Sequence, residues 1–186
     1  MKGNIINMRI ISGKARGTKL YTLDGTATRP TLDRVKESLF NIIQNDIEDS
    51  TVLDLFSGSG NLGIEALSEG ASYAYLVDKN IKCIKTINKN INNIGIENVK
   101  VLNMDYKLAL KQINKKLDLI FLDPPYKTSL IEDSLKLIDE YDLLSDDGLI
   151  VCESDDVDKI IYSNKYESIK EKRYGDKYIV LLKKVW

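Results

Sequence analysis

The sequence predicts an α/β fold of the Rossmann-like type, with a mostly parallel seven-stranded sheet, helices on both faces and a C-terminal antiparallel hairpin. Between residues 51 and 152, short apolar runs alternate with helical patterns. This alternation is typical of a parallel sheet that is covered on both faces. Two long strand-like runs then flank Gly175 and Asp176, and this arrangement indicates an antiparallel hairpin.

Each element has its own signal in the chain. Apolar residues at helical spacing predict a first helix over Thr31–Asn45. Short apolar runs predict parallel strands at Thr51–Phe56, Tyr73–Val77, Val99–Asn103, Leu117–Leu122 and Leu149–Cys152. The segments between them predict helices over Leu62–Ser68, Asn80–Asn93 and Leu130–Ile138, and a short helix from Tyr106. The hairpin strands are expected at Tyr166–Tyr174 and Tyr178–Val185.

Length and composition fit one soluble domain. A chain of 186 residues is long enough for one full core and short for two. Its content of 43% hydrophobic and 30% charged residues is typical of a globular protein. No apolar run approaches the ~20 residues that span a bilayer, and the first residues lack the apolar core of a signal peptide. We therefore expect a cytoplasmic protein with no membrane partner.

The scarce residue types exclude several chemistries. The chain contains no histidine, which excludes histidine general bases, histidine metal ligands and Ser-His-Asp catalysis. Cys83 and Cys152 are far apart and fit reduced thiols better than a disulfide. We expect a site without a metal, and a monomer, because nothing in the sequence indicates an obligate oligomer.

Charge is unevenly distributed along the chain. Residues 1–36 contain eight Lys or Arg against two Asp, although the net charge of the whole chain is −1. A basic arm over residues 1–30, in the same domain as residues 31–186, indicates a polyanionic partner held at one end. The alternative interpretation is a solvated basic terminus. The candidate phosphate contacts are Arg9, Lys14, Arg16, Lys19, Arg29 and Arg34.

A glycine-rich loop joins the first predicted parallel strand to its helix. Gly58, Gly60 and Gly63 have the G-x-G-x-x-G spacing, which by itself is a weak signal that also suits a dinucleotide. Asp54 lies within the strand, where a carboxylate can reach the amino group of a cationic ligand that has no pyrophosphate. The alternative is a loop that only packs the helix on the strand.

Two further acids follow the next two strands. Asp78 comes directly after Tyr73–Val77, where it could accept hydrogen bonds from ribose hydroxyls or simply stabilise a helix start. Asp105 follows Val99–Asn103 and could accept from an adenine amino group or cap a helix. Each acid is ambiguous by itself. Together with Asp54, however, acids at the carboxyl ends of three successive strands predict a ligand site at that edge.

The predicted strand Leu117–Leu122 leads directly into Asp123-Pro124-Pro125-Tyr126. Proline fixes φ and donates no backbone hydrogen bond, so this turn is stiff. It offers a carboxylate, a backbone carbonyl at Pro124 and an aromatic ring, which suit a planar base whose amino group points at the acceptors. The motif indicates methyl transfer to the nitrogen of a nucleobase or an amide. The alternative is a capped turn with Tyr126 in the core.

Taken in order, the glycine loop, Asp78, Asp105 and Asp123-Pro124-Pro125-Tyr126 resemble the class I S-adenosylmethionine-dependent methyltransferases. More narrowly, the chain resembles the RsmD family of 16S rRNA (guanine-N2) methyltransferases over nearly its whole length from Met8. The stretches that carry the resemblance are Met8–Gly13, Arg16-Gly17, Arg29–Asn41, Asp54–Gly60 and Leu62–Leu67. Two features depart from the family pattern: residues 1–7 precede the usual start, and Asn61 stands where a small apolar residue is expected.

The resemblance implies roles for individual residues. It implies that S-adenosyl-L-methionine is the cofactor, bound by Asp54, Phe56, Ser57, Gly58, Gly60, Asp78, Lys79, Asp105 and Tyr106. It also implies that Asp123, the Pro124 carbonyl and Tyr126 hold the target guanine for methylation at N2, guanine 966 in the usual rRNA numbering. The partner is then 16S rRNA in the small ribosomal subunit, bound in part through the phosphate contacts of the basic arm.

Three other functions stay open on the residues alone. DNA adenine-N6 and other amino-group methyltransferases use similar proline-proline-aromatic motifs, although this chain has no obvious separate target-recognition domain. A nicotinamide-dependent oxidoreductase fits the glycine spacing, and a comparison of S-adenosylhomocysteine binding with NAD binding separates the two. A non-catalytic RNA-binding module is disfavoured by the intact acids Asp54, Asp78, Asp105 and Asp123.

Overall fold

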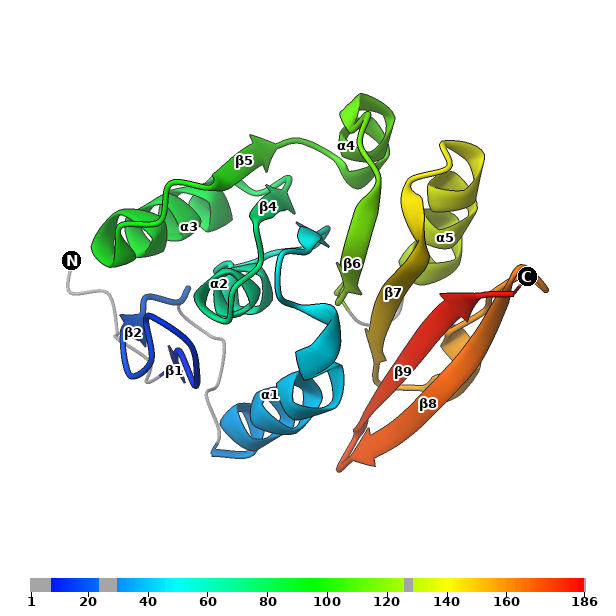
Figure 1. Cartoon of the computed structure of the whole chain (residues 1–186), viewed down its shortest axis with the longest axis horizontal. Helices are drawn as coiled ribbons and strands as arrows, with labels where there is room; N and C mark the ends of the chain where they lie inside the picture. The colour runs from blue at the N-terminus through cyan, green and yellow to red at the C-terminus, as the bar shows by residue number, and fades with distance from the viewer. Residues whose placement is uncertain (1–7, 24–29, 126–128, 186) are drawn as a thin grey trace.

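The computed structural model describes residues 8–23, 30–125 and 129–185. Within these residues, seven strands form one sheet in the order β5-β4-β3-β6-β7-β9-β8 (Figure 1). The parallel strands are β3 (Thr51–Asp54), β4 (Tyr73–Asp78), β5 (Val99–Asn103), β6 (Leu117–Leu122) and β7 (Leu144–Ser154). The antiparallel hairpin is formed by β8 (Tyr166–Tyr174) and β9 (Lys177–Lys184). The predicted fold class is confirmed.

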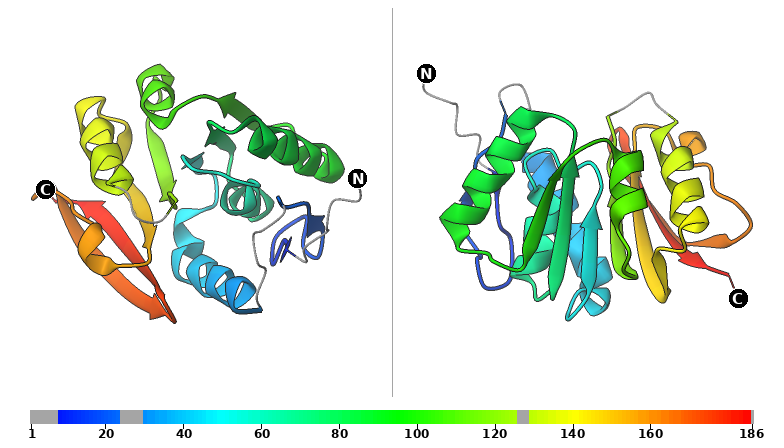
Figure 2. Two further views of the ribbon diagram at one scale, coloured as in Figure 1. Left: turned by 180° about the vertical axis from the view of Figure 1, so that it is seen from behind. Right: turned by 90° about the horizontal axis from the view of Figure 1, so that it is seen from above.

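Helices cover both faces of the sheet (Figure 2). One core lies beneath α1 (Pro30–Ile43), α2 (Asn61–Ser68) and α3 (Ile81–Ile94). The other lies beneath α4 (Tyr106–Gln112) and α5 (Leu130–Glu140). Two short 3-10 helices are η1 (Gln44–Asp46) and η2 (Val157–Lys159). None of the described helices has the length and apolar character that crossing a bilayer requires.

Strand β6 explains why the predicted strands are apolar throughout. Leu119 and Phe121 face the core beneath α1–α3, whereas Ile120 and Leu122 face the core beneath α4 and α5. All four side chains are fully buried. Because successive side chains of a strand point to opposite faces, a sheet covered on both faces needs an uninterrupted apolar run. The first acid after this run, Asp123, therefore lies where the chain leaves the sheet.

Most predicted boundaries agree with the structure, and β7 is the main exception. Strand β7 begins at Leu144 and not at the predicted Leu149, because Leu144 pairs with Leu117 ahead of an irregularity in the β6–β7 ladder. The long helix α3 has the predicted limits to within a residue, since the Asn80 side chain caps its start and Gly95 ends it.

The N-terminal segment is part of the fold in residues 8–23. Strand β1 (Met8–Arg9) pairs antiparallel with β2 (Lys19–Leu20). The sequence did not predict this ladder, because two-residue strands that carry charges give no periodic pattern. Ile10 and Leu20 are nevertheless fully buried in the core beneath α1–α3. This part of the basic arm is therefore packed on the body of the domain.

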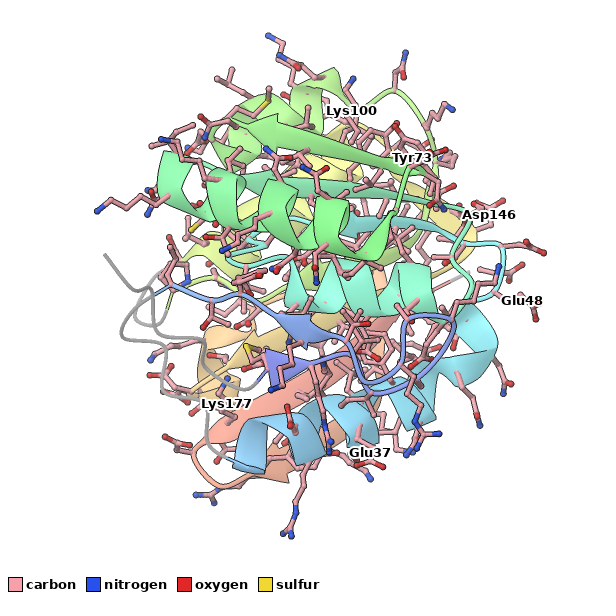
Figure 3. The ribbon with its side chains drawn as sticks, turned by 90° about the vertical axis from the view of Figure 1, so that its left-hand side faces the viewer. Glu37, Glu48, Tyr73, Lys100, Asp146 and Lys177 are labelled. Atoms are coloured by element: carbon pink, nitrogen blue, oxygen red, sulfur yellow. The ribbon has the colours of Figure 1, made fainter. Side chains whose placement is uncertain are left out.

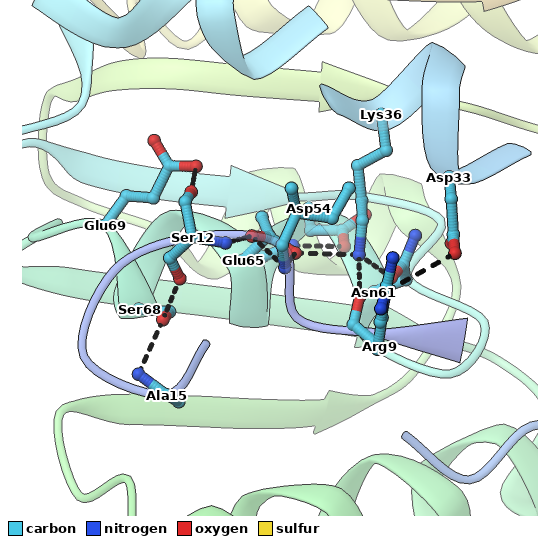
Figure 4. A network of polar contacts seen from close by, with 12 residues as sticks. Arg9, Ser12, Ala15, Asp33, Lys36, Asp54, Asn61, Glu65, Ser68 and Glu69 are labelled. Atoms are coloured by element: carbon cyan, nitrogen blue, oxygen red, sulfur yellow. Dashed lines mark hydrogen bonds and ion pairs between the residues drawn. The ribbon is translucent and has the colours of Figure 1, made fainter. Parts of the chain in front are cut away.

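A buried ion pair anchors the segment to two helices (Figure 4). Lys36 of α1 and Glu65 of α2 lie 2.7 Å apart, and their side chains are 4% and 0% exposed. Glu65 accepts hydrogen bonds from the backbone N–H groups of Ile11 and Ser12 at 2.8 and 3.0 Å. Lys36 donates to the Arg9 carbonyl at 2.7 Å. Because buried charges need partners, this network fixes the arm against α1 and α2.

Asn61 completes the network at the first residue of α2. Its Oδ1 atom accepts a hydrogen bond from Lys36 Nζ at 2.7 Å. The small apolar residue expected here from the family pattern would remove one partner of the buried ammonium group. The polar side chain is thus explained by Lys36, and it ties the arm to the end of the glycine loop.

The chain reverses its direction across the sheet at β3. From β3 it continues to β4 and β5 on one side, and it then crosses back to β6 on the other. In open α/β sheets, ligands bind outside the carboxyl ends of the strands at such a reversal. Tyr73 marks the amino end of β4. Figure 3 shows Lys177, at the start of β9, on the opposite side of the molecule from Tyr73 and Asp146.

Candidate active site

A cavity of about 610 Å³ lies at the carboxyl ends of the parallel strands. Residues that follow β3, β4, β5 and β6 line it, together with side chains from α1, β7 and β9. The predicted site residues in its wall are Asp54, Phe56, Ser57, Gly58, Asp78, Lys79, Asp105, Tyr106, Asp123 and Pro124. The fold therefore gathers acids that are far apart in the sequence around one space.

Asp54 ends β3 and is almost completely buried. Its Oδ2 atom accepts a hydrogen bond from the Gly63 N–H at 3.1 Å, and the Ser57 hydroxyl donates to its backbone carbonyl at 2.7 Å. Burial raises the pKa of the Asp54 carboxyl to about 7, the Gly63 hydrogen bond opposes the shift, and the charge of Asp78 adds to it. A cationic ligand would offset this buried charge and favour the ionised form.

Asp78 ties the glycine loop to the start of α3. Its Oδ2 atom accepts from the Gly58 N–H at 3.0 Å, and its Oδ1 atom accepts from the Asn80 N–H at 2.7 Å. Gly58 has a φ of +56°, a left-handed conformation that favours glycine. Asp78 is half-buried in the cavity wall, so it holds the turn and also presents its carboxylate to a ligand.

Asp105 and two aromatic rings form the neighbouring wall. Asp105 caps α4, because its Oδ1 atom accepts from the Lys107 N–H at 2.9 Å. The ring of Tyr106 packs against that of Phe56, with 5.6 Å between the centroids. Lys79 lies exposed at the rim. The two rings give an apolar wall, and the Asp105 carboxylate beside them is a hydrogen-bond acceptor. This combination suits a purine.

The other two glycines of the loop are placed where α2 packs against its neighbours. A Cβ atom at Gly63 would lie 2.1 Å from Leu76 Cδ2, and one at Gly60 would lie 2.9 Å from Ile64 Cδ1. Gly60, predicted as a cofactor contact, is the N-cap of α2 and is not among the described residues that line the cavity. The glycine spacing thus reflects close packing of α2 as well as an open approach to the cavity.

Asp123 and Pro124 follow β6 and line the cavity together with Pro125. Burial raises the pKa of Asp123 well above its usual range, the charge of Glu153 raises it further, and Lys177 opposes the shift. Tyr126, the third residue predicted to be catalytic, lies outside the described residues.

Among the described residues, three charged side chains of the cavity wall were not predicted from the sequence: Lys36, Glu153 and Lys177. Glu153 directly follows the predicted strand Leu149–Cys152, so the rule that strand carboxyl ends line ligand sites would have selected it. Lys177 follows a hairpin turn and has no comparable signal. In the sequence, Lys36 resembles any other charge of the predicted first helix, because its burial depends on tertiary packing.

The predicted phosphate contacts lie mostly at the surface of the arm and of α1. Arg9 is exposed, with its Nε atom 3.8 Å from Asp33 Oδ2. The other exposed residues of this set are Lys14, Arg16, Lys19 and Arg34. Arg29 lies outside the described residues.

Known proteins resemble the chain over most of its length. The family model described as conserved hypothetical protein 95 matches residues 8–183. YlbH of Bacillus subtilis strain 168 is 45% identical over 152 residues, which cover 80% of this chain and 83% of that protein. Ribosomal RNA small subunit methyltransferase D of Escherichia coli strain K12 is 38% identical over 148 residues, covering 80% and 75%.

One solved structure shares the fold of this chain over nearly its whole length. The Escherichia coli protein yhhF has a TM-score of 0.86 and 32% identity, and the match covers 95% of this chain and 97% of that one. The shared architecture extends from the N-terminal segment to the C-terminal hairpin, which is the span that the family model matches. The chain therefore belongs to the conserved hypothetical protein 95 family, the RsmD family of methyltransferases.

Proposed function

We propose that the protein transfers a methyl group from S-adenosylmethionine to the exocyclic N2 of a guanine in 16S rRNA of the small ribosomal subunit. One observation carries the proposal: Asp123 and Pro124 share a single cavity with Asp54, Asp78 and Asp105. The first group suits an amino-bearing base, and the second suits a cationic nucleoside. The name of the Escherichia coli relative, a small subunit ribosomal RNA methyltransferase, supports RNA as the acceptor.

The residues present fit a sulfonium nucleoside. The buried Asp54 carboxyl, with a pKa of about 7, gains a cationic partner in an amino acid ammonium group. Asp78 and Asp105 would offer acceptors for ribose hydroxyls and for a purine amino group, and the rings of Phe56 and Tyr106 would give the purine an apolar surface. When bound, the cofactor supplies an electrophilic methyl group on a positively charged sulfur.

Asp123 and Pro124 act on the base side of the cavity. The exocyclic nitrogen of guanine is a poor nucleophile, because its lone pair is delocalised into the ring. The Asp123 carboxylate and the Pro124 carbonyl accept its two N–H groups, so the nitrogen becomes more pyramidal and its developing positive charge is stabilised. The two prolines hold these acceptors in place before the base arrives. Tyr126 stacks on the base in this proposal.

The proposal also sets requirements on the RNA. Methyl transfer is an in-line displacement, so positioning contributes most of the rate, and a base in a duplex must first leave the stack. The exposed Arg9, Lys14, Arg16, Lys19 and Arg34, with Arg29, contact phosphates around the target. Such contacts give affinity and salt dependence without base choice.

The test uses small ribosomal subunits from cells that lack this protein. Purified protein and labelled S-adenosylmethionine are added, and the rRNA is digested for nucleoside mass spectrometry. We expect label in N2-methylguanosine, and none when the subunits come from cells that contain the protein. Label in another nucleoside would overturn the guanine assignment. No label, with binding of S-adenosylhomocysteine intact, would overturn the RNA acceptor in favour of DNA or protein.

A further inference from the structure

Three charged side chains on three neighbouring strands line the base side of the cavity. Asp123 follows β6, Glu153 lies near the end of β7, and Lys177 begins β9. The sheet order places β7 between β6 and β9. Two carboxylates and one ammonium group therefore follow one another across the sheet at its carboxyl edge.

The ladder register puts Asp123 and Glu153 on the same face. Leu122 of β6 pairs with Cys152 of β7 in parallel register. The residues that follow this pair, Asp123 and Glu153, point to the opposite face from Leu122 and Cys152. This is the face of the core beneath α1–α3, where α1 and its buried Lys36 lie.

Lys177 reaches the same face from the antiparallel side. Glu153 pairs with Ile179, and Lys177 lies two residues before Ile179, so all three share one face. Lys177 Nζ donates a hydrogen bond to Glu153 Oε1, and the two side chains are 21% and 10% exposed. The result is a low-exposure ion pair in the wall of the cavity, next to Asp123.

Asp123, Glu153 and Lys177 form a charged row at the edge of an otherwise apolar face of the sheet. The next residues inward on the same face of the three strands are Phe121, Val151 and Ile179. All three are buried in the core beneath α1–α3. Replacing buried ion pairs by apolar residues is often neutral or stabilising, so packing alone gives no reason for charge at these positions. A polar ligand in the cavity would give such a reason, because all three side chains line it.

We propose that Asp123, Glu153 and Lys177 read the Watson–Crick edge of the target guanine, an inference that rests on the proposed function. Along this edge guanine presents the N2 amino donor, the N1–H donor and the O6 acceptor. Asp123 accepts from N2, Glu153 accepts from N1–H, and Lys177 donates to O6. The order of the three groups on the base matches the strand order β6, β7 and β9.

The same row rejects the other bases. When adenine places its amino group on Asp123, its N1 carries no hydrogen and turns a lone pair toward the Glu153 carboxylate. Cytosine likewise has a lone pair and no hydrogen at N3, and uracil has no amino group. Sites that leave buried polar groups unpaired discriminate strongly against the wrong substrate. The cavity thus selects guanine without any contact to the surrounding sequence.

The test replaces the target guanine, once located by mass spectrometry, with 2,6-diaminopurine in otherwise identical small-subunit rRNA. This base keeps the 2-amino group, but its N1 has no hydrogen and its 6-position is a donor. We expect kcat/KM for the native protein to be at least about 100-fold lower on this RNA than on guanine RNA. In Glu153→Gln and in Lys177→Met, the ratio should fall below about tenfold, because each change removes a mismatch.

A matched control and a folding control accompany the variants. Glu132→Gln breaks the ion pair with Lys136 on α5, outside the cavity, and should keep the native ratio. Binding of S-adenosylhomocysteine should be unchanged in both variants, and Lys177→Met alone suffices if Glu153→Gln does not fold. An unchanged ratio in the folded variants, or equal rates of the native protein on both RNAs, would overturn this inference and leave the proposed function intact. Failure of the native protein to methylate guanine RNA would overturn the proposed function instead.

Discussion

The two sides of the cavity hold their acids by different means. Beside β3, β4 and β5, the carboxylates of Asp54, Asp78 and Asp105 each accept a hydrogen bond from a backbone N–H of the segment that follows the strand, and Asp78 also accepts one from Gly58 N–H in the glycine loop. Beside β6, β7 and β9, Glu153 is bound by the side chain of Lys177, and burial together with the charge of Glu153 raises the pKa of Asp123.

This difference separates two tasks. Acids that hold the backbone in place preorganise a loop, so a change there alters the shape of the cofactor side. On the second side, the Glu153–Lys177 contact joins two side chains, so we expect a substitution there to act mainly through the lost charge. We therefore expect substitutions on the first side to weaken cofactor binding and substitutions on the second side to lower transfer.

The largest effect is expected for Asp123→Ala. Removing the acceptor that stabilises the developing charge should lower the transfer rate at saturating cofactor by about 10²–10³-fold. The affinity for S-adenosylhomocysteine, measured by calorimetry, should stay nearly unchanged. Asp146→Ala is the control, because Asp146 is exposed and lies on the far side of the molecule from Lys177. Equal losses of transfer and affinity would end the catalytic assignment.

Asp78→Ala should have the opposite signature. Loss of a carboxylate that accepts from Gly58 and Asn80 should weaken binding of S-adenosylhomocysteine by about 10–100-fold. Transfer at saturating cofactor should change little. Asp156→Ala is the matched control, because Asp156 caps η2 through the Asp158 N–H at 3.1 Å, away from the cavity. If both variants bind equally well, Asp78 only orders its turn.

The pH dependence of cofactor binding should follow Asp54. Its pKa is raised to about 7 by burial, and a cationic ligand favours the ionised form, so binding releases a proton below this pKa and affinity rises with pH. Between pH 6 and pH 8 the affinity should increase by about tenfold. Asp54→Asn should bind more weakly and show a flat profile. An unchanged slope in this variant would assign the titration to another group.

The smallest effect is expected at the exposed charges of the basic arm, because Lys14 and Arg16 are not among the described residues that line the cavity. Reversing the charges of the exposed Lys14 and Arg16 should raise the KM for rRNA several-fold and lower the salt slope by about one unit per lost phosphate contact. The same reversal at Lys111 and Lys115, exposed in and just after α4, is the control. Equal KM values in the two double variants would exclude the arm as an RNA contact.

Much of the fold could be predicted from local patterns. Strands buried on both faces need apolar runs, and caps such as Asn80 and Gly95 mark the helix limits. The pairing of β1 with β2 could not be predicted, because its stability comes from Ile10 and Leu20 in the core and from the Lys36–Glu65 pair. These contacts join segments that are distant in sequence.

The candidate site also contains residues that could be predicted from the sequence and residues that could not. Asp54, Asp78, Asp105 and Asp123 follow strands that are evident in the sequence, so the topology rule for open α/β sheets predicts that they converge. Lys177 enters the cavity only because an antiparallel strand is added beside β7. Its role depends on sheet order, which no local pattern specifies.

A crystal structure with S-adenosylhomocysteine tests the division of the cavity most directly. We expect the amino acid group at Asp54, the ribose at Asp78 and the adenine beside Asp105 and Phe56. The sulfur should face Asp123, with Glu153 and Lys177 left uncovered by the ligand. A ligand that lies over β6, β7 and β9 and contacts Glu153 or Lys177 would refute this division of the cavity.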